Sequence, residues 1–203
     1  MSKKPFIVFE GIEGSGKTYH INNVKKYLVK NKKKFIHIRE PGGSNNSEKI
    51  RKLILNNKST FNKNTDLLLY MSARSENIEL IKKNYRKKII LIDRFIDSTI
   101  AYQHYGMGIN IKFIKMINSF FMKDISVDFT FLNIVNPKNM KERLLKRKKL
   151  NRYDQFNAKF YTKVQNGFIK ILKKNPKKYM KIDSNLNIND NKNIIENKIK
   201  NFL

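Results

Sequence analysis

The residues best suited to chemistry form an eight-residue stretch near the N-terminus, Gly-Ile-Glu-Gly-Ser-Gly-Lys-Thr at positions 11–18. The stretch fits G-x-x-x-x-G-K-[ST], a pattern whose backbone N–H groups cradle phosphate oxygens at the start of a helix. In this pattern the lysine reaches the β- and γ-phosphates of a nucleotide, and the hydroxyl after it holds Mg²⁺. We therefore expect Lys17 to bind ATP phosphates and Thr18 to bind the metal ion.

The segments on either side of this loop are those that the chemistry requires. The apolar run 6–9 precedes the loop and reads as a buried strand, while Ile21, Val24 and Leu28 follow it at helical spacing. The alternative is a glycine-rich turn that binds nothing. A strand, a glycine loop and a helix in this order favour phosphate binding over that alternative.

Polar side chains also follow two other apolar runs. Asp93 and Arg94 come directly after residues 89–92, where an aspartate serves as the second Mg²⁺ element and an arginine suits a phosphate. Residues 39–43 read Arg-Glu-Pro-Gly-Gly, and their glycines allow a ligand to approach the backbone closely. The bond before the proline is a candidate for the cis form. Alone, each motif is also compatible with a helix cap or a tight surface turn, so the phosphate loop decides the interpretation.

A mostly apolar helix pattern carries a possible nucleobase site. Tyr70 and Arg74 are four residues apart and share one helix face, where a ring and a guanidinium can sandwich a base. By spacing alone, a core tyrosine beside an arginine with a buried stem is the simpler explanation. Residues 97–103 add hydroxyl and amide groups just beyond Asp93 that suit contacts to a base edge or a sugar.

Five short apolar runs alternate with helical patterns along the chain. The alternation predicts an α/β fold of the P-loop NTPase type, with helices on both faces of a five-stranded parallel sheet, in one domain over residues 1–203. Ligands then gather at the carboxyl ends of the strands. The predicted strands are 6–10, 35–39, 89–93, 129–135 and 180–183, and the predicted helices are 17–31, 47–57, 65–84, 96–104, 111–122, 137–148, 154–175 and 188–202.

The formal net charge of +28 raises the question of a polyanionic partner such as nucleic acid. Lysines are scattered over the whole 203-residue chain, and asparagine and isoleucine are also abundant, which indicates A/T-rich codon usage and argues against a nucleic-acid surface. The basic stretch 141–152 is compatible with a solvated charge run, a nucleic-acid patch or a lid whose arginines close over ATP.

Composition also indicates in which cellular compartment the protein is expected. The chain has no cysteine, and no run approaches the ~18 apolar residues of a membrane helix. Residues 1–4 lead directly into the first predicted strand and leave no room for a signal peptide. We therefore expect a cytoplasmic protein that does not insert into a membrane.

Taken together, the motifs resemble the thymidylate kinases (dTMP kinases) of the nucleoside monophosphate kinase group. The resemblance covers the chain from Phe6 to about Ser184, in family order. It implies the reaction ATP + dTMP → ADP + dTDP with Mg²⁺, carried out by a homodimer. The matching stretches are FEGIEGSGKT, REPGG with EKIR, LLLYMSAR, DRFIDSTIAYQ and the late series FLN, ERLLKR, LNRYDQ and IDS.

The resemblance also implies a role for each matching residue. The ATP phosphates are bound by Gly11, Ile12, Glu13, Gly14, Ser15, Gly16, Lys17 and Thr18. In the acceptor site, the resemblance implies that Arg51 and Arg94 hold the dTMP phosphate, with Glu40 and Asp93 near the magnesium. Tyr70 stacks on thymine beside Arg74, while Thr99 and Gln103 read the base edge. Glu13 faces the sugar 3′-hydroxyl, and Tyr102 disfavours a ribose 2′-hydroxyl.

The residue after Glu13 is Gly14 rather than a basic residue, which in this family marks the bacterial-type arrangement. A short lid, about 143–155, then supplies the catalytic arginine, for which Arg147 and Arg152 are the candidates. Arg143 is implied to pack near the adenine. One departure from the family pattern is Met107, at a position where members often carry arginine.

Three other functions remain compatible with the motifs. One is a P-loop kinase acting on another nucleoside monophosphate, which the Tyr70, Arg74, Thr99 and Gln103 set disfavours. Another is a P-loop protein that binds nucleic acid. The last is a nucleotide-binding scaffold without activity, which the intact Lys17 argues against.

Overall fold

The computed structural model describes residues 3–203. Within this range five strands form one parallel sheet in the order β2-β3-β1-β4-β5. This arrangement confirms the predicted α/β class. The strands are β1 (Phe6–Gly11), β2 (Phe35–Arg39), β3 (Ile89–Asp93), β4 (Phe129–Ile134) and β5 (Tyr179–Asp183).

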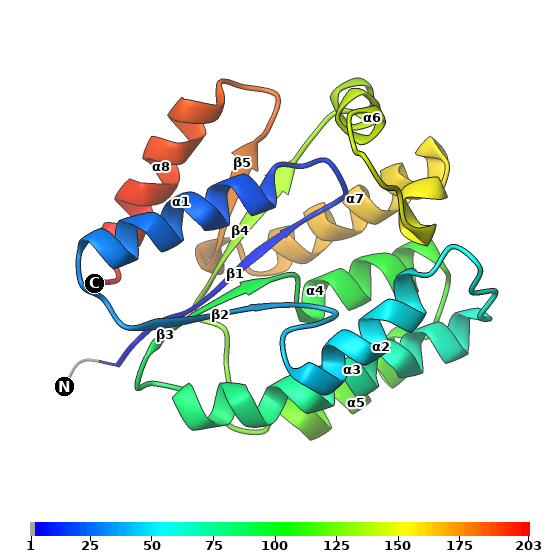
Figure 1. Ribbon diagram of the computed structural model, residues 1–203, viewed down its shortest axis with the longest axis horizontal. Coiled ribbons are helices and arrows are strands. Elements are labelled where there is room, and N and C mark those ends of the chain that lie inside the picture. Colours follow the sequence, from blue (N-terminus) through cyan, green and yellow to red (C-terminus); the bar gives the residue numbers. More distant parts are fainter. Residues whose placement is uncertain (1–2) are drawn as a thin grey trace.

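Helices cover both faces of the sheet (Figure 1). They are α1 (Lys17–Lys30), α2 (Asn45–Leu55), α3 (Lys63–Asn84), α4 (Ile96–Thr99), α5 (Ile111–Met122), α6 (Pro137–Leu145), α7 (Ala158–Lys174) and α8 (Ile188–Lys200). Shorter turns are the π-helical segment η1 (Ile100–Gly106) and the 3-10 turns η2 (Arg152–Gln155) and η3 (Pro176–Lys178). None of the helices in the described range is both long and apolar enough to cross a membrane.

The central strand explains why the sheet has helices on both sides. All six residues of β1 are buried, and successive side chains point to opposite faces. Ile7 and Phe9 join a core cluster with α1 and α8, whereas Phe6 and Val8 join a cluster with α3 and α5. A parallel strand buried on both faces needs an unbroken apolar run, which is the pattern seen in the sequence.

Two predicted helices differ most from those observed, and the helix predicted over 137–148 ends earlier, at Leu145. Residues 96–104 form the short α4 followed by the π-helical η1, rather than one helix. The helix predicted from residue 154 begins only at Ala158, because the side chain of Asn157 caps α7 by accepting the N–H of Phe160 at 2.9 Å. Before it, Asn151 and Asp154 form a reciprocal capping box around η2. The predicted lid, about 143–155, therefore consists of the end of α6, a connecting loop and a separate turn.

The sheet brings the predicted chemical groups to one edge. Strands β1, β2 and β3 are neighbours and run in the same direction, so the loop after β1, the residues after Arg39 and the pair Asp93-Arg94 emerge side by side.

Candidate active site

A cavity of about 300 Å³ opens at this carboxyl edge. Residues from the phosphate loop, α1, β2, α2, α3, β3, α4, η1 and the segment 143–155 form its walls. Thirteen of the residues singled out from the sequence line it: Glu13, Lys17, Thr18, Glu40, Arg51, Tyr70, Arg74, Asp93, Arg94, Thr99, Tyr102, Gln103 and Arg147.

The phosphate loop has the geometry that its sequence predicts. Gly16 precedes α1 in a left-handed conformation, with φ at 85°, and provides no side-chain cap for the helix. A Cβ built at this position would meet no atom within 4 Å, so the space beside the helix N-terminus is open. Free N–H groups of the first turn and the helix dipole make this space a suitable cradle for phosphate oxygens.

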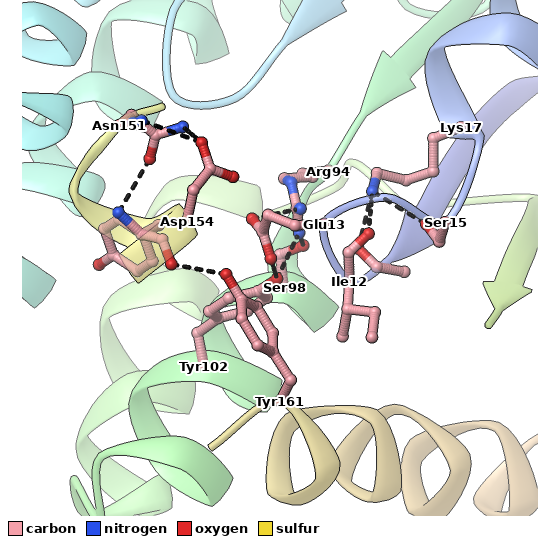
Figure 2. Close-up of polar contacts among 12 residues, drawn as sticks. Ile12, Glu13, Ser15, Lys17, Arg94, Ser98, Tyr102, Asn151, Asp154 and Tyr161 are labelled. Atoms are coloured by element: carbon pink, nitrogen blue, oxygen red, sulfur yellow. Dashed lines mark hydrogen bonds and ion pairs between the residues drawn. The ribbon is translucent and has the colours of Figure 1, made fainter. Parts of the chain in front are cut away.

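Lys17 is buried and folds back over the loop (Figure 2). Its Nζ donates to the carbonyl oxygens of Gly11 at 2.8 Å and Ile12 at 2.9 Å, and to Ser15 Oγ at 3.3 Å. Burial and the nearby Arg94 guanidinium lower the pKa of Lys17 to about 8. The ammonium is held by neutral acceptors alone, which leaves its charge available for a phosphate.

Arg143 reinforces the loop from behind. Its guanidinium donates to the carbonyl of Gly14 at 2.9 Å and to that of Ser184 at 2.6 Å. Ser184 in turn donates its hydroxyl to the carbonyl of Ser15 at 2.8 Å. Arg143 therefore links α6, the phosphate loop and the turn after β5, and it is not among the residues that line the cavity.

Glu13, Arg94 and Tyr102 all line the cavity and form one hydrogen-bonded group (Figure 2). Arg94 pairs with Glu13 at 2.7 Å and donates to the Tyr102 hydroxyl at 3.2 Å, and that hydroxyl donates to Glu13. Burial alone would raise the pKa of Glu13, but Arg94 and Lys17 outweigh it and hold this pKa below its ordinary value. Glu13 is therefore an acceptor-only carboxylate at neutral pH.

Glu40 and Arg74 form a second, more deeply buried pair. Arg74 is 2% exposed, and its guanidinium lies 2.7 Å from Glu40 and 2.6 Å from the side-chain oxygen of Asn118. The Glu40–Pro41 bond is cis, and the carbonyl of Pro41 accepts a hydrogen bond from Arg51 at 2.5 Å. The chain itself thus occupies much of the donor capacity of Arg74, so this residue helps to build the wall as well as line it.

One wall of the cavity is aromatic and includes Tyr153, a residue to which the sequence analysis assigned no role. The Tyr153 ring meets the rings of Tyr70 and Tyr102 edge-on, with 5.9 Å between centroids in both cases. Gln103 is buried beside them and donates to the Tyr153 hydroxyl at 3.4 Å. Tyr153 lies 83 positions after Tyr70 in the chain, and no local pattern connects the two.

Thr18 and Asp93 are the candidate metal residues, and both line the cavity. The Oδ1 atom of Asp93 is buried and has no hydrogen-bond partner within residues 3–203. A buried carboxylate oxygen left without a partner is costly unless a cation or water satisfies it. Hydroxyl and carboxylate oxygens are also the donors that Mg²⁺ prefers, so the residues present fit this ion.

The structure separates the two candidate lid arginines. Arg147 lines the cavity, is 39% exposed at its side chain and pairs with Asp154 at 2.5 Å. Arg152 does not line the cavity, because its guanidinium binds Asp66 and the carbonyl of Ile54, the latter at 3.1 Å. Of the two, only Arg147 faces the space that a nucleotide would occupy.

Glu10 is a structural part of the site to which the sequence assigned no role. Its fully buried carboxylate accepts the N–H groups of Phe95 and Ser98 at 2.8 and 3.2 Å, and the Ser98 hydroxyl at 2.5 Å. It thereby caps the first turn of α4, directly after Arg94. A carboxylate at the end of an otherwise apolar strand is the signal that could have revealed it.

Comparison with known proteins gives one consistent result. The sequence model of the thymidylate kinase family matches residues 9–195. The thymidylate kinase of Kosmotoga olearia is 32% identical over 200 residues, covering 98% of this chain and 95% of the relative, and that of Clostridium novyi is 38% identical over 190 residues, covering 91% and 93%.

A crystal structure of thymidylate kinase from Ehrlichia chaffeensis has the same fold, with a TM-score of 0.78 and 32% sequence identity over 98% of this chain and 99% of the other. The match extends over nearly the full length of both chains, so it includes the phosphate loop, the other segments that line the cavity and residues 143–155. The chain belongs to the thymidylate kinase family.

Proposed function

We propose that this protein transfers the γ-phosphoryl group of ATP to dTMP, giving ADP and dTDP. The observation that carries the proposal is that one cavity contains both Lys17 of the phosphate loop and the group formed by Glu13, Arg94 and Tyr102. A phosphate donor and a nucleotide acceptor bound there would meet end to end, as an in-line transfer requires.

The reaction needs positioning and charge neutralisation more than proton removal. A phosphate monoester has a second pKa near ~6, so the attacking oxygen of dTMP is already largely ionised at neutral pH. Two anions must then be brought together against their repulsion. Lys17 supplies positive charge on the donor side, Arg51 and Arg94 supply it on the acceptor side, and Arg147 approaches from the lid.

Thr18 and Asp93 would hold the Mg²⁺ that accompanies ATP. When bound, this ion supplies neutralisation of the charge that develops on the β- and γ-phosphate oxygens. Asp93 is the last residue of β3, and Thr18 lies in the first turn of α1, directly after the phosphate loop that follows the neighbouring strand β1.

Selection of the acceptor follows from the polar group and the aromatic wall. The Tyr102 hydroxyl is occupied by Glu13 and leaves little freedom to accommodate an extra 2′-hydroxyl. Tyr70 and Tyr153 offer ring surface for a pyrimidine. A single methyl group in such a pocket contributes only about 1–3 kcal/mol, so we expect dUMP to be used more slowly than dTMP rather than rejected.

Among the lid residues, we assign the catalytic charge to Arg147. It is half-exposed at the cavity and paired with Asp154 alone, so a phosphate can compete for it. Arg152 reaches a phosphate only by leaving Asp66.

We further propose a cytoplasmic homodimer. Three large apolar side chains are exposed on one face of α5, at the spacing i, i+3 and i+7: Phe113 is 41% exposed, Met116 is 61% exposed and Phe120 is 71% exposed. An apolar stripe of this kind is typical of a subunit interface. The cytoplasmic assignment rests on the substrates, since ATP and deoxynucleotides are used where DNA precursors are made.

A substrate panel tests the proposed reaction. Purified protein is mixed with ATP, Mg²⁺ and one of dTMP, dUMP, dCMP, dGMP, AMP or CMP, and ADP release is followed in a coupled assay. We expect the highest kcat/KM for dTMP and a lower value for dUMP. A higher kcat/KM for CMP, AMP or dGMP would assign the chain to a different nucleotide kinase activity.

A further inference from the structure

Asp66 is a buried carboxylate that belongs to none of the contacts assigned above to the substrates. It lies in the first turn of α3, is 2% exposed and does not line the cavity. Each of its oxygens has one partner from η2: Oδ1 binds the Arg152 guanidinium and Oδ2 accepts the Tyr153 hydroxyl. These partners are 86 and 87 positions away in the sequence.

Only one of the two partners of Asp66 is part of the cavity wall. Tyr153 lines it, whereas Arg152 does not. Arg152 is 15% exposed at its side chain and also donates to the carbonyl of Ile54 at 3.1 Å, so it serves as the counter-ion that makes burial of the Asp66 carboxylate tolerable. With this charge compensated, the other oxygen of Asp66 is free to orient the Tyr153 hydroxyl.

Asp66 shares its helix with the acceptor wall. Tyr70 follows it by one helical turn on the same face of α3, and the Tyr153 ring stands nearly perpendicular to the Tyr70 ring, at 89° and 5.9 Å. Tyr153 is buried, at 3% exposure, so its ring has few other positions available. The hydroxyl bond to Asp66 therefore fixes where the ring of Tyr153 stands relative to that of Tyr70.

We propose that Asp66 is a positioning residue for acceptor selection. By holding the Tyr153 hydroxyl, it docks the lid turn η2 onto α3 and keeps the Tyr153 ring edge-on against the Tyr70 ring, which sets the shape of the aromatic wall that the pyrimidine meets. The inference rests on the proposed dTMP kinase function and extends it to a residue that touches neither substrate. A purely structural ion pair is the competing explanation, and it predicts an effect on stability alone.

The test compares Asp66→Asn with Asp128→Asn. Asp128 also pairs with an arginine, Arg86 at 2.9 Å, but it accepts the backbone N–H of Phe6 at the opposite end of β1 and does not line the cavity. The two substitutions make the same chemical change to a buried or partly buried ion pair. Steady-state kinetics with dTMP and dUMP and the melting temperature are measured for wild type and both variants.

We expect Asp66→Asn to raise the KM for dTMP about tenfold, consistent with the weakening of one charge-assisted hydrogen bond, with kcat within about twofold of wild type. The ratio of kcat/KM for dTMP over dUMP falls in the same variant. Asp128→Asn lowers the melting temperature and leaves both kinetic values unchanged. If Asp66→Asn behaves like Asp128→Asn, the positioning role is wrong.

Tyr153→Phe keeps the test decisive where Asp66→Asn does not fold. This variant removes only the hydroxyl and keeps the ring, and we expect a higher KM for dTMP with kcat preserved. An unchanged KM for dTMP in Tyr153→Phe contradicts the inference. A wild-type enzyme that does not phosphorylate dTMP overturns the proposed function, whereas an active wild type with unaffected variants overturns only the role of Asp66.

Discussion

Several charged side chains that line the cavity form ion pairs, and these pairs differ in how far their arginines are buried. Arg74 is 2% exposed and has two side-chain partners, Glu40 and Asn118. Arg147 is 39% exposed at its side chain and has Asp154 alone. Arg74 and Glu40 are both buried, so drawing Arg74 away would leave a buried charge without its partner, whereas Asp154 keeps its hydrogen bonds from Asn151 when Arg147 leaves. A nucleotide phosphate can thus recruit the more exposed Arg147 at lower cost than Arg74. We therefore place transition-state charge stabilisation on Arg147.

Replacing Arg147 with alanine tests this assignment. We expect kcat to fall about a hundredfold, because a positively charged donor aimed at the transferring group is lost, while the KM for dTMP stays within about threefold. Lys146→Ala, one position earlier and exposed, is the matched control and keeps a near-normal kcat. A normal kcat in Arg147→Ala would show that this arginine does not act on the reacting phosphate.

Glu10 makes a prediction about pH. Burial, followed by the nearby Asp97 carboxyl, raises the pKa of Glu10 from 4.5 to about 7, although Ser98, the Phe95 N–H and Arg94 oppose the shift. Between these two pH values the folded protein holds a proton that the unfolded chain has released. The free energy of unfolding therefore loses this contribution as the pH rises from about 4.5 through about 7.

Glu10→Gln removes that titration. Urea unfolding of wild type and variant between pH 5 and pH 8 should show a stability that depends less steeply on pH in the variant. Glu79→Gln, at an exposed position of α3, serves as control and keeps the wild-type slope. Equal slopes in Glu10→Gln and wild type contradict a raised pKa of Glu10 in the folded protein.

Single residues of the site differ in how far the sequence reveals them. Asp93 and Arg94 follow an apolar run directly, and Lys17 and Thr18 end a recognisable glycine loop. Local pattern and parallel-sheet topology are therefore enough to place these four residues at one cavity. Tyr153 and its partner Asp66 are brought together only by the packing of η2 on α3. Arg152 illustrates the same limit, since its motif does not reveal that a distant carboxylate holds it away from the cavity.

Among the elements, the π-helical segment η1 carries Tyr102 and Gln103 and owes its position to α7. Two glycines allow the close approach: a Cβ at Gly167 would lie 2.6 Å from the Tyr105 ring, and one at Gly106 would lie 2.7 Å from Phe160. The backbone of each element thus contacts an aromatic ring of the other. This contact fixes the position of η1, and with it that of Tyr102 and Gln103 in the cavity wall.

Gly167→Ala should disturb this contact. The added methyl group collides with Tyr105, and we expect a loss of about 1–3 kcal/mol in the free energy of unfolding together with a higher KM for dTMP. Urea unfolding and kinetics measure the two effects. Asn166→Ala, an exposed neighbour on α7, controls for the substitution itself. Unchanged stability in Gly167→Ala means that Tyr105 moves aside freely.

The elements that the sequence predicts best are those with a single dominant signal. Strands β1 and β3 begin and end within one residue of the prediction, because strands buried on both faces need continuous apolar runs. The prediction is poorer from 96 to 106 and from 154 to 157. There, the contact between η1 and α7 and the caps formed by Asn151 and Asn157 override helical periodicity.

At the scale of the whole molecule, positive charge and the apolar stripe on α5 are the surface features that matter. Positive charge spread over the chain, +28 in total, produces a field that attracts anionic nucleotides. Helix α5, which carries this stripe, lies beside α3 on one side of the sheet (Figure 1). A second copy packed there would cover Phe120, the most exposed of its three large apolar side chains.

Phe120→Glu tests the proposed homodimer. Wild type should have twice the chain mass by light scattering, and the variant should have the mass of a single chain because a buried carboxylate opposes association. Leu186→Glu changes an exposed apolar residue before α8 and should leave the dimer intact. A monomeric wild type, or a dimeric Phe120→Glu, contradicts an interface at this position.

The central claim is that one cavity binds ATP through the phosphate loop and transfers its γ-phosphoryl group to dTMP. The most direct test follows the label from [γ-³²P]ATP in a mixture with dTMP, Mg²⁺ and either wild type or Lys17→Ala. The account predicts labelled dTDP in a one-to-one ratio with ADP for wild type, and none above background for a folded Lys17→Ala. Release of labelled inorganic phosphate without labelled dTDP, or undiminished transfer by Lys17→Ala, would contradict it.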